Sequence, residues 1–251
     1  MPKKLWITLV ALVLVSFGVT AYKAKNEVIV KASFETGTDS LASTEVVAND
    51  AVSSEKMRFT ALYDVLNLQN LKLNKQAFQL AINGYSKLKT QGKIKNDLLT
   101  IIDFSQPSTS KRMYIIDMKK NKLVRHSHVA HGRNTGLLMA TTFSNKAESY
   151  QSSLGFYVTS ETYIGKHGLS LRLDGVERNI NDNARARAIV VHGADYANES
   201  FYKSTGYLGR SFGCPAVPTK DAPEIIQNIK NGSCMFIYST DKGYLKQSSL
   251  I

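Results

Sequence analysis

Short stretches rich in β-branched and aromatic residues follow one another from Leu98 onward, and they constrain the fold more than any other feature. Clusters of Gly, Asn, Asp and Ser separate them, as is typical of strands joined by turns. Because no helical pattern follows each stretch, a doubly wound α/β fold is disfavoured. The pattern predicts a mainly β domain with flanking helices (α+β), its sheet forming a sandwich or barrel. The expected strands are 98–104, 113–118, 123–129, 137–143, 155–163, 169–173, 188–192 and 233–239.

Helical patterns occur before and near the end of these strands. Residues 56–95 are predicted to form an N-terminal helical region, because apolar residues recur there at three- and four-residue steps. Asn74 is placed to cap the start of its main helix and Gly92 to end it. Near the C-terminus, Asp221 and Glu224 have the spacing of a capping box ahead of a stripe of isoleucines.

The N-terminus has the layout of an export signal. Lys3 and Lys4 precede an uncharged apolar run over 5–19, and Val19-Thr20-Ala21 places small residues at a cleavage site. The run is shorter than the ~20 residues of a typical membrane span. Residues 1–21 are therefore predicted to be a signal peptide, or an N-terminal anchor if uncleaved. We expect an exported protein of the periplasm or cell envelope, held at the inner membrane only in the uncleaved case.

Residues 22–55 are predicted to be a disordered tether. Over 33–55 the chain has five acids, no Lys or Arg, and too little apolar surface to offset the entropy of ordering. The net charge of the chain is +12; residues 1–32 contribute +4 and 33–55 contribute −5, so residues 56–251 carry +13. A polyanionic envelope partner and a plain solubility charge both fit this excess. Nucleic acid is not an expected partner, because no basic stretch interleaves with aromatic residues.

Cys214 is the strongest candidate for chemistry. It follows Gly213 and precedes a proline, which places it on a tight turn where a nucleophile can project and backbone N–H groups can face an oxyanion. His192 ends an apolar run, and a histidine at the end of a buried strand opens onto the rim of a sheet. The imidazole would take the thiol proton in acyl transfer and later return one to a leaving amine. Gly193 supplies the nearest carbonyl that could orient this imidazole.

Structural interpretations of the same residue types stay open. In an exported protein Cys214 and Cys234 could form a structural disulfide, although Cys234 lies in an apolar run that suits a buried thiol. His126, His128 and His131 superficially resemble a metal cluster. Along a strand, however, the first two share one face and the third falls beyond the strand end. No metal and no cofactor are therefore predicted.

Several motifs then point to a known family. His192-Gly193, followed after 17 residues by Ser211-Phe212-Gly213-Cys214, resembles the catalytic motif of YkuD-type L,D-transpeptidases. Further stretches are similar to one branch, the murein L,D-transpeptidase catalytic domain-like family of exported bacterial proteins. These stretches are 100–104, 130–134, 153–157, 165–174, 192–195 and 209–216, and the resemblance covers residues 70–240.

The resemblance implies a β-rich catalytic domain over 56–251 and a thiol acyl-transferase that acts on peptidoglycan (murein) stem peptides. Cys214 would attack the carbonyl between a diaminoacid and D-alanine, and an amine of a neighbouring stem would accept the acyl group. His192 would be the general base and then the general acid, oriented by the Gly193 carbonyl. The backbone N–H groups of Gly213 and Cys214 would bind the oxyanion, and Ser211 belongs to the same motif. Water as the acceptor would instead make an L,D-carboxypeptidase.

The chain departs from the family pattern at two positions. Phe212 stands where a histidine is usual, and Ala216 stands where Arg or Asn is usual. This removes a contact to the substrate, for which Arg210, His167 and Arg172 are candidate replacements; Phe212 itself is also a candidate substrate contact. A non-catalytic wall-binding module with a Cys214–Cys234 disulfide is the alternative from another functional class. A free Cys214 thiol of lowered pKa is the feature expected of the enzyme alone.

Overall fold

The computed structural model describes residues 61–251. The predicted signal segment, the predicted tether and the first residues of the predicted helical region lie outside the described residues. Within 61–251, no helix is long and apolar enough to cross a membrane.

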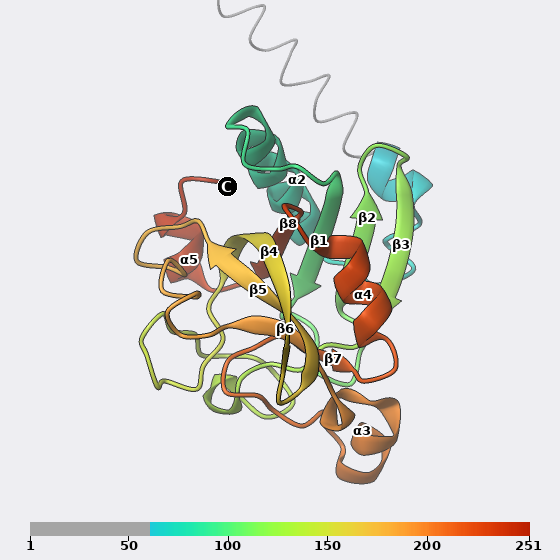
Figure 1. Ribbon diagram of the computed structural model, residues 1–251. Helices are drawn as coiled ribbons and strands as arrows, with labels where there is room; N and C mark the ends of the chain where they lie inside the picture. The colour runs from blue at the N-terminus through green and yellow to red at the C-terminus, as the bar shows by residue number, and fades with distance from the viewer. Residues whose placement is uncertain (1–60) are drawn as a thin grey trace, which may run out of the picture. The chain divides into compact units, whose positions relative to one another are not determined.

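Eight strands of the described chain form one mixed sheet, in the order β3-β2-β1-β8-β4-β5-β6-β7 (Figure 1). Their bounds are β1 Leu98–Asp103, β2 Met113–Asp117, β3 Lys122–Ser127, β4 Gly155–Gly165, β5 Gly168–Gly175, β6 Val190–Ala194, β7 Ala216–Pro218 and β8 Cys234–Tyr238. The pairs β1/β8 and β6/β7 are parallel, and the other pairs are antiparallel. This arrangement confirms the mainly β prediction.

The sheet curls nearly into a barrel. Just beyond β3, at one edge of the sheet, Ala130 exchanges backbone hydrogen bonds of 2.7 and 3.3 Å with Ala216 of β7, at the other edge. A closed or nearly closed sheet leaves few unpaired backbone groups at its edges. The contact also fixes β7, and with it the turn that carries Cys214, against the far side of the sheet.

Besides the helical residues 61–65, four helices of the described chain flank the sheet: α2 Lys75–Thr90, α3 Glu199–Thr205, α4 Ala222–Ile229 and α5 Lys242–Gln247. The side chain of Asn74 accepts from the N–H groups of Gln76 and Ala77 at 2.8 and 3.1 Å, which confirms the predicted cap of α2. Gly92 follows the helix end with a φ of +70°. Within the described part of the predicted helical region, 61–95, only residues 61–65 and α2 are helical, and turns connect them.

The main core lies between α2 and the centre of the sheet. All residues of β8 are buried, as are all but the first of β1. Phe156 of β4 stacks on Phe236 of β8 with ring centroids 4.2 Å apart. The helix can approach these rings because Gly84 has no side chain: a Cβ there would lie 2.1 Å from the Phe156 ring. Close helix–sheet packing therefore depends on this one glycine.

Two predictions about elements are wrong, and one strand was not predicted. Residues 137–143 are not a strand, and Leu137 and Leu138 lie 48% and 40% exposed in a loop. The strand β7 has no expected counterpart, because three residues are too few to show a pattern. Asp221 makes no capping hydrogen bond; its carboxylate instead accepts from Ser127 (3.3 Å) and lies 3.9 Å from Arg125.

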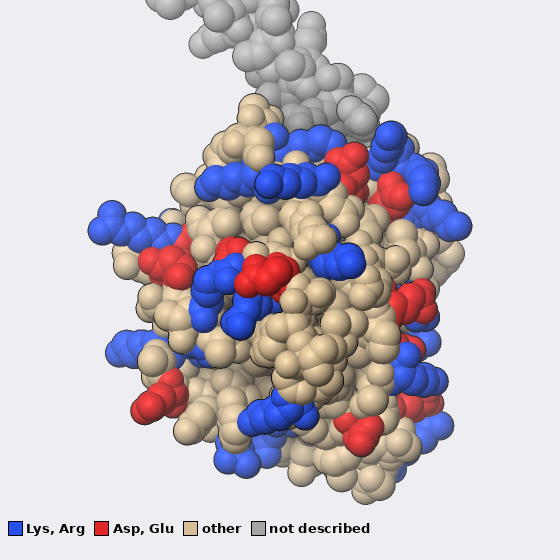
Figure 2. Space-filling view, in the orientation of Figure 1, with Lys and Arg blue, Asp and Glu red and all other residues tan. Residues whose placement is uncertain are grey.

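The basic charge is spread widely. Figure 2 shows Lys and Arg scattered over the face in view, with Asp and Glu among them, and not collected into one stripe. A stripe of basic residues along one surface is the usual footprint of nucleic-acid binding. No such stripe is present on this face.

Candidate active site

Ser211 braces the turn that carries Cys214. Its hydroxyl donates to the carbonyl of Cys214 (2.6 Å) and accepts from the N–H of Gly213 (3.0 Å). Its backbone is bonded on both sides, to His131 (3.0 Å) and Arg133 (2.7 Å). Gly213 has a φ of +123°, a value that favours glycine, and a Cβ there would lie 2.8 Å from the carbonyl oxygen of Gln151. The turn is thus held by short contacts on every side.

The thiol of Cys214 is free and sits close to backbone groups of the segment before β6. Its Sγ accepts from the N–H of Val190 (3.5 Å) and donates to the carbonyl of Ala188 (3.7 Å). Burial of the sulfur raises the pKa of this thiol, and the opposing effects of the Val190 N–H, Arg187 and Lys166 are smaller. The prediction of a lowered pKa is therefore wrong for this structure, and the resting group is the neutral thiol.

The second cysteine does not pair with it. Cys234 is a free, fully buried thiol inside β8, where burial raises its pKa. The predicted alternative of a Cys214–Cys234 disulfide is therefore wrong.

His192 lies in β6 and is only 2% exposed. Its Nδ1 is 2.9 Å from the carbonyl oxygen of Gly193, the orienting group named from the sequence. Since a carbonyl can only accept, Nδ1 carries the proton and Nε2 is left as the basic nitrogen. Burial lowers the pKa of the imidazole; the Gly193 carbonyl opposes this, while His167 and Lys166 add to it. His192 is therefore neutral at neutral pH.

His167 covers this imidazole. It lies between β4 and β5, at the tip of their hairpin, and its ring stacks on that of His192 with centroids 4.3 Å apart and planes 24° apart. Gly168 follows with a φ of +72°, which allows the tight turn. The exposed tip of the hairpin thus covers the buried imidazole of His192.

A cavity of about 530 Å³ contains Cys214, His192 and most of the predicted site residues. Among the predicted residues, His167, Arg210, Ser211 and Phe212 also line it. Sequence reasoning missed four other lining residues that bear on charge and shape: Tyr163, Lys166, Arg187 and Tyr196. No Asp or Glu of residues 61–251 lines this cavity, so its charged walls are entirely cationic.

Arg187 has the most contacts of the missed residues. Its guanidinium donates to the carbonyls of Ser144 (2.7 Å) and Gln151 (2.6 Å) and to the Ser153 hydroxyl (2.6 Å). It therefore ties the loop before β4 to the cavity wall and places positive charge near Cys214. No sequence pattern marks it, because it lies in a polar stretch whose partners are far along the chain.

Arg172 is not part of this site. It is paired with Glu161 at 3.1 Å and lies over the Tyr163 ring, 4.5 Å from its centroid, and it does not line the cavity. Its position as a substrate contact is thus not supported by the structure. Asp174 of the same strand is also paired, because its carboxylate accepts a hydrogen bond from Arg185 (2.5 Å).

No group of three His, Cys, Asp or Glu residues within 61–251 is arranged to hold a metal ion. His131, the third histidine of the apparent metal cluster, is instead a buried residue that contacts the Arg112 guanidinium at 2.7 Å. Burial together with this charge lowers the pKa of His131 to about 3.

Residues 69–238 match the family model described as the L,D-transpeptidase catalytic domain. The chain belongs to this family. The match covers more than half of the chain and includes the Cys214 turn, His192 and every strand of the sheet.

Solved structures of L,D-transpeptidases are also similar, at low identity. L,D-transpeptidase 3 from Mycobacterium tuberculosis, in complex with a faropenem-derived adduct, has 12% identity and a TM-score of 0.37, covering 57% of this chain and 60% of that one. An L,D-transpeptidase from Mycobacterium smegmatis has 11% identity and a TM-score of 0.36, covering 57% of this chain and 59% of that one. One from Xylanimonas cellulosilytica has 14% identity and a TM-score of 0.33, with coverages of 66% and 81%. The chain thus spans about three fifths of the length of the two mycobacterial structures. No curated protein matches the chain.

The family departure at Phe212 has a clear structural consequence in this L,D-transpeptidase domain. Phe212 is 57% exposed, its ring lies 4.8 Å from that of Tyr150, and the Arg133 guanidinium lies 5.5 Å from its centroid. An exposed aromatic patch therefore borders the cavity at a position where the family usually has an imidazole. Arg210, by contrast, is held by the carbonyls of Arg133 (3.3 Å) and Gly136 (3.5 Å).

Proposed function

We propose that the chain is an exported cysteine acyl-transferase that acts on peptidoglycan stem peptides, an L,D-transpeptidase. One observation carries the proposal: the free thiol of Cys214 and the neutral imidazole of His192 line the same cavity, in a chain of the L,D-transpeptidase catalytic domain family. The L,D-transpeptidase domain supplies the class of reaction, and the cavity supplies the two groups that this reaction requires.

The protonation states favour general-base catalysis over a preformed thiolate–imidazolium pair. Burial raises the pKa of Cys214 and lowers that of His192, so the proton rests on sulfur before substrate binds. Nε2 of His192 takes this proton as the sulfur attacks the carbonyl carbon. The resulting imidazolium is stabilised by the Gly193 carbonyl at Nδ1 (2.9 Å).

The proton and acyl group then follow a balanced course. Collapse of the tetrahedral intermediate breaks the amide bond, His192 returns its proton to the leaving nitrogen of D-alanine, and a thioester remains on Cys214. An amine of a second stem attacks the thioester and restores the thiol. If water attacks instead, the product is the shortened stem, which is the L,D-carboxypeptidase alternative.

The backbone N–H of Cys214 is the proposed oxyanion donor, because it has no hydrogen-bond partner among residues 61–251. The N–H of Gly213 is already bonded to the Ser211 hydroxyl at 3.0 Å. It can contribute only if this hydrogen bond breaks as the oxyanion forms. We therefore assign Ser211 to holding the turn, and the Cys214 N–H to the developing charge.

The cationic walls fit an anionic donor peptide. Lys166, Arg187 and Arg210 line the cavity without an acidic neighbour in it, and stem peptides carry free carboxylates. Lys166 and His167 lie at the exposed tip of the β4–β5 hairpin. A substrate that binds there therefore also contacts the residue whose ring covers His192. We propose Lys166, His167, Arg187, Arg210 and Phe212 as substrate contacts. They would replace the Arg or Asn that is usual at the position of Ala216.

The test is incubation of the full-length chain with purified tetrapeptide stems, followed by mass measurement of the products. Loss of D-alanine with formation of a dimer is the expected result, and loss of D-alanine alone assigns the carboxypeptidase. Cys214→Ser is the matched control, since it preserves the size of the side chain and removes the thiol. Failure of the folded wild-type chain to change the peptide, or equal turnover by the variant, would contradict the proposal.

Export is proposed from the N-terminal segment alone. Cell fractionation with an antibody to the folded domain should find it in the periplasm or cell envelope. Release by osmotic shock indicates cleavage, and retention with the inner membrane indicates an anchor.

A further inference from the structure

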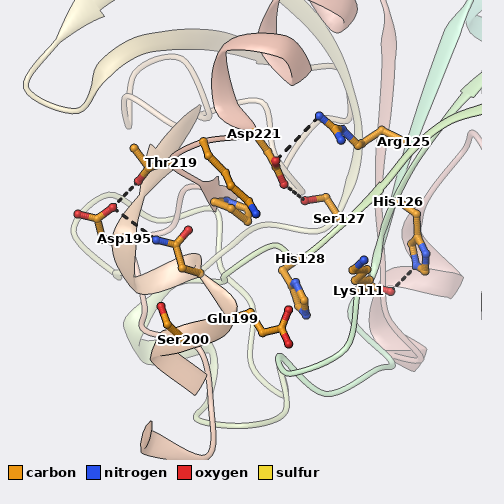
Figure 3. Close-up of a pocket in the computed structure, with 13 residues that line it drawn as sticks. Lys111, Arg125, His126, Ser127, His128, Asp195, Glu199, Ser200, Thr219 and Asp221 are labelled. Atoms are coloured by element: carbon orange, nitrogen blue, oxygen red, sulfur yellow. Dashed lines mark hydrogen bonds and ion pairs between the residues drawn. The ribbon is translucent and has the colours of Figure 1, made fainter. Parts of the chain in front are cut away.

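A second, larger cavity of about 730 Å³ lies outside the site described above (Figure 3). It is bounded by the end of β3, the start of α3 and the loop that follows β7. The segment that separates it from the first cavity is short, because Tyr196 lines the first cavity while Asp195 and Asn198 line the second. Pro218 is its one apolar lining residue, so it suits a small polar ligand.

Much of the charge around this cavity is already compensated within the protein. Arg125 pairs with Glu224 and lies 3.9 Å from Asp221. Glu199 pairs with Lys203 at 2.9 Å. These groups hold the walls in place and leave little net charge for a ligand.

The two histidines add no charge at neutral pH. The Nε2 atoms of His126 and His128 lie 2.7 and 3.1 Å from the carbonyls of Lys111 and Thr109, so each of these nitrogens carries a proton and donates it. Burial lowers the pKa of both rings. Figure 3 shows the two rings on either side of Lys111, where they form neutral polar walls of the cavity.

Three charged groups remain without a partner of opposite charge among residues 61–251. They are the ammonium groups of Lys111 and Lys220 and the carboxylate of Asp195. The carboxylate is nevertheless fixed: Thr219 donates to its Oδ1 at 2.7 Å, and Asn198 at 3.5 Å, which leaves Oδ2 free. Figure 3 places Asp195 and Lys111 on opposite sides of the cavity, so a ligand between them meets unlike charges at its two ends.

We propose that this cavity binds an acidic amino acid, or the end of an acidic peptide, that carries two carboxylates and one ammonium group. The carboxylates pair with Lys111 and Lys220, and the ammonium group pairs with Asp195. Charge-assisted hydrogen bonds of this kind are stronger than those between neutral groups. The proposal does not depend on thiol chemistry at Cys214 and concerns a separate site.

Free glutamate is the probe, and two analogues each lack one of its charges. Glutarate keeps both carboxylates and lacks the ammonium group; 4-aminobutyrate keeps the ammonium group and one carboxylate. Binding to the full-length chain is measured by titration calorimetry at low ionic strength, because salt screens such contacts. We expect glutamate to bind about ten-fold or more tightly than either analogue, since each loses a charge-assisted contact.

Variants assign the contacts. Lys111→Met and Lys220→Met should each weaken glutamate binding about ten-fold. Lys146→Met is the matched control, because Lys146 is an exposed lysine that does not line the cavity, and it should leave the affinity unchanged. Asp195→Asn should weaken the binding of glutamate and leave that of glutarate unchanged, so that glutarate also reports whether the variant is folded.

Three results would overturn the proposal. The first is an absence of glutamate binding to the folded wild-type chain at millimolar concentration. The second is an equal loss of affinity in the Lys146→Met control, which would indicate nonspecific attraction to a basic protein. The third is binding of glutarate or inorganic phosphate as tight as that of glutamate and insensitive to Asp195→Asn, which would make the cavity a simple anion site.

Discussion

The centre of the sheet (the core region) and its β6–β7 end (the site end) are built on different principles. Around β1, β8 and β4, apolar side chains fill the space beneath α2, and the rings of Phe156 and Phe236 stack at its centre. Around β6 and β7, the structure depends on single polar contacts, such as those of the Ser211 hydroxyl to Gly213 and Cys214. Burial of apolar area supplies most of the stability of a domain, whereas a catalytic constellation needs position. Substitutions in the core region should therefore change stability, and those at the site end should change activity.

Cys214→Ser gives the largest effect and tests the site end alone. Loss of the proposed nucleophile should lower kcat for D-alanine release by at least about 10⁴-fold. The free energy of unfolding should change by no more than about 0.5 kcal/mol, because oxygen replaces sulfur without altering the turn. Product mass and urea unfolding measure the two quantities. A strongly destabilised variant would show that the nucleophile also holds the fold, which breaks the comparison.

Phe236→Ala tests the core region. Deleting a fully buried ring leaves a cavity, and the expected loss in the free energy of unfolding is about 3–5 kcal/mol. The folded fraction should keep the wild-type kcat within about two-fold, since the ring contributes no group to the reaction. Urea unfolding, followed by rate measurement well below the midpoint, checks both parts. A large fall in kcat with unchanged stability would reverse the assignment of the two regions.

The same division explains what the sequence could predict. Asn74 caps α2 through the N–H groups of its own first turn, so local sequence is sufficient. Asp221 has an equally good local pattern, but Arg125 and Ser127, almost a hundred residues earlier, engage its carboxylate. Arg172 is similarly paired with Glu161, a contact that its local sequence does not indicate.

The candidate site shows the same limit. His192, Gly193 and Cys214 stand out because their types and spacing carry chemistry; His192 and Cys214 line the same cavity, and the Gly193 carbonyl contacts His192. Arg187 could not be found, since its partners at 144–153 become neighbours only in the folded chain. The protonation state of Cys214 was also beyond reach, because it is decided by burial, which a sequence motif does not report.

Ser211→Ala sharpens the comparison, since it removes a buried contact at the site end. The N–H of Gly213 and the carbonyl of Cys214 both lose their partner, at a cost of about 1–3 kcal/mol. Because this cost falls on the turn that places the sulfur, kcat/KM should drop about 10- to 100-fold. Ser211→Thr keeps the hydroxyl and should restore most of the rate. Equal rates in the alanine and wild-type proteins would contradict a positioning role.

The smallest expected effect is a shift in the pKa of His192 when His167, whose ring covers it, is replaced. The direction of the shift follows from the charges around His192. Burial, and to a lesser extent the charges of His167 and Lys166, lower the pKa of His192, so the imidazole stays neutral, and active as a base, to a pH below the usual ~6.5. His167→Phe preserves the stacked ring and the burial but removes the neighbouring positive charge. The pKa of His192 should therefore rise by less than about one unit, and the acid limb of kcat/KM should move to higher pH by the same amount. NMR titration of the His192 ring measures the shift without catalysis, and Lys166→Met should shift it in the same direction. A fall in pKa would mean that the His167 ring acts by shielding His192 from water, and not through its charge.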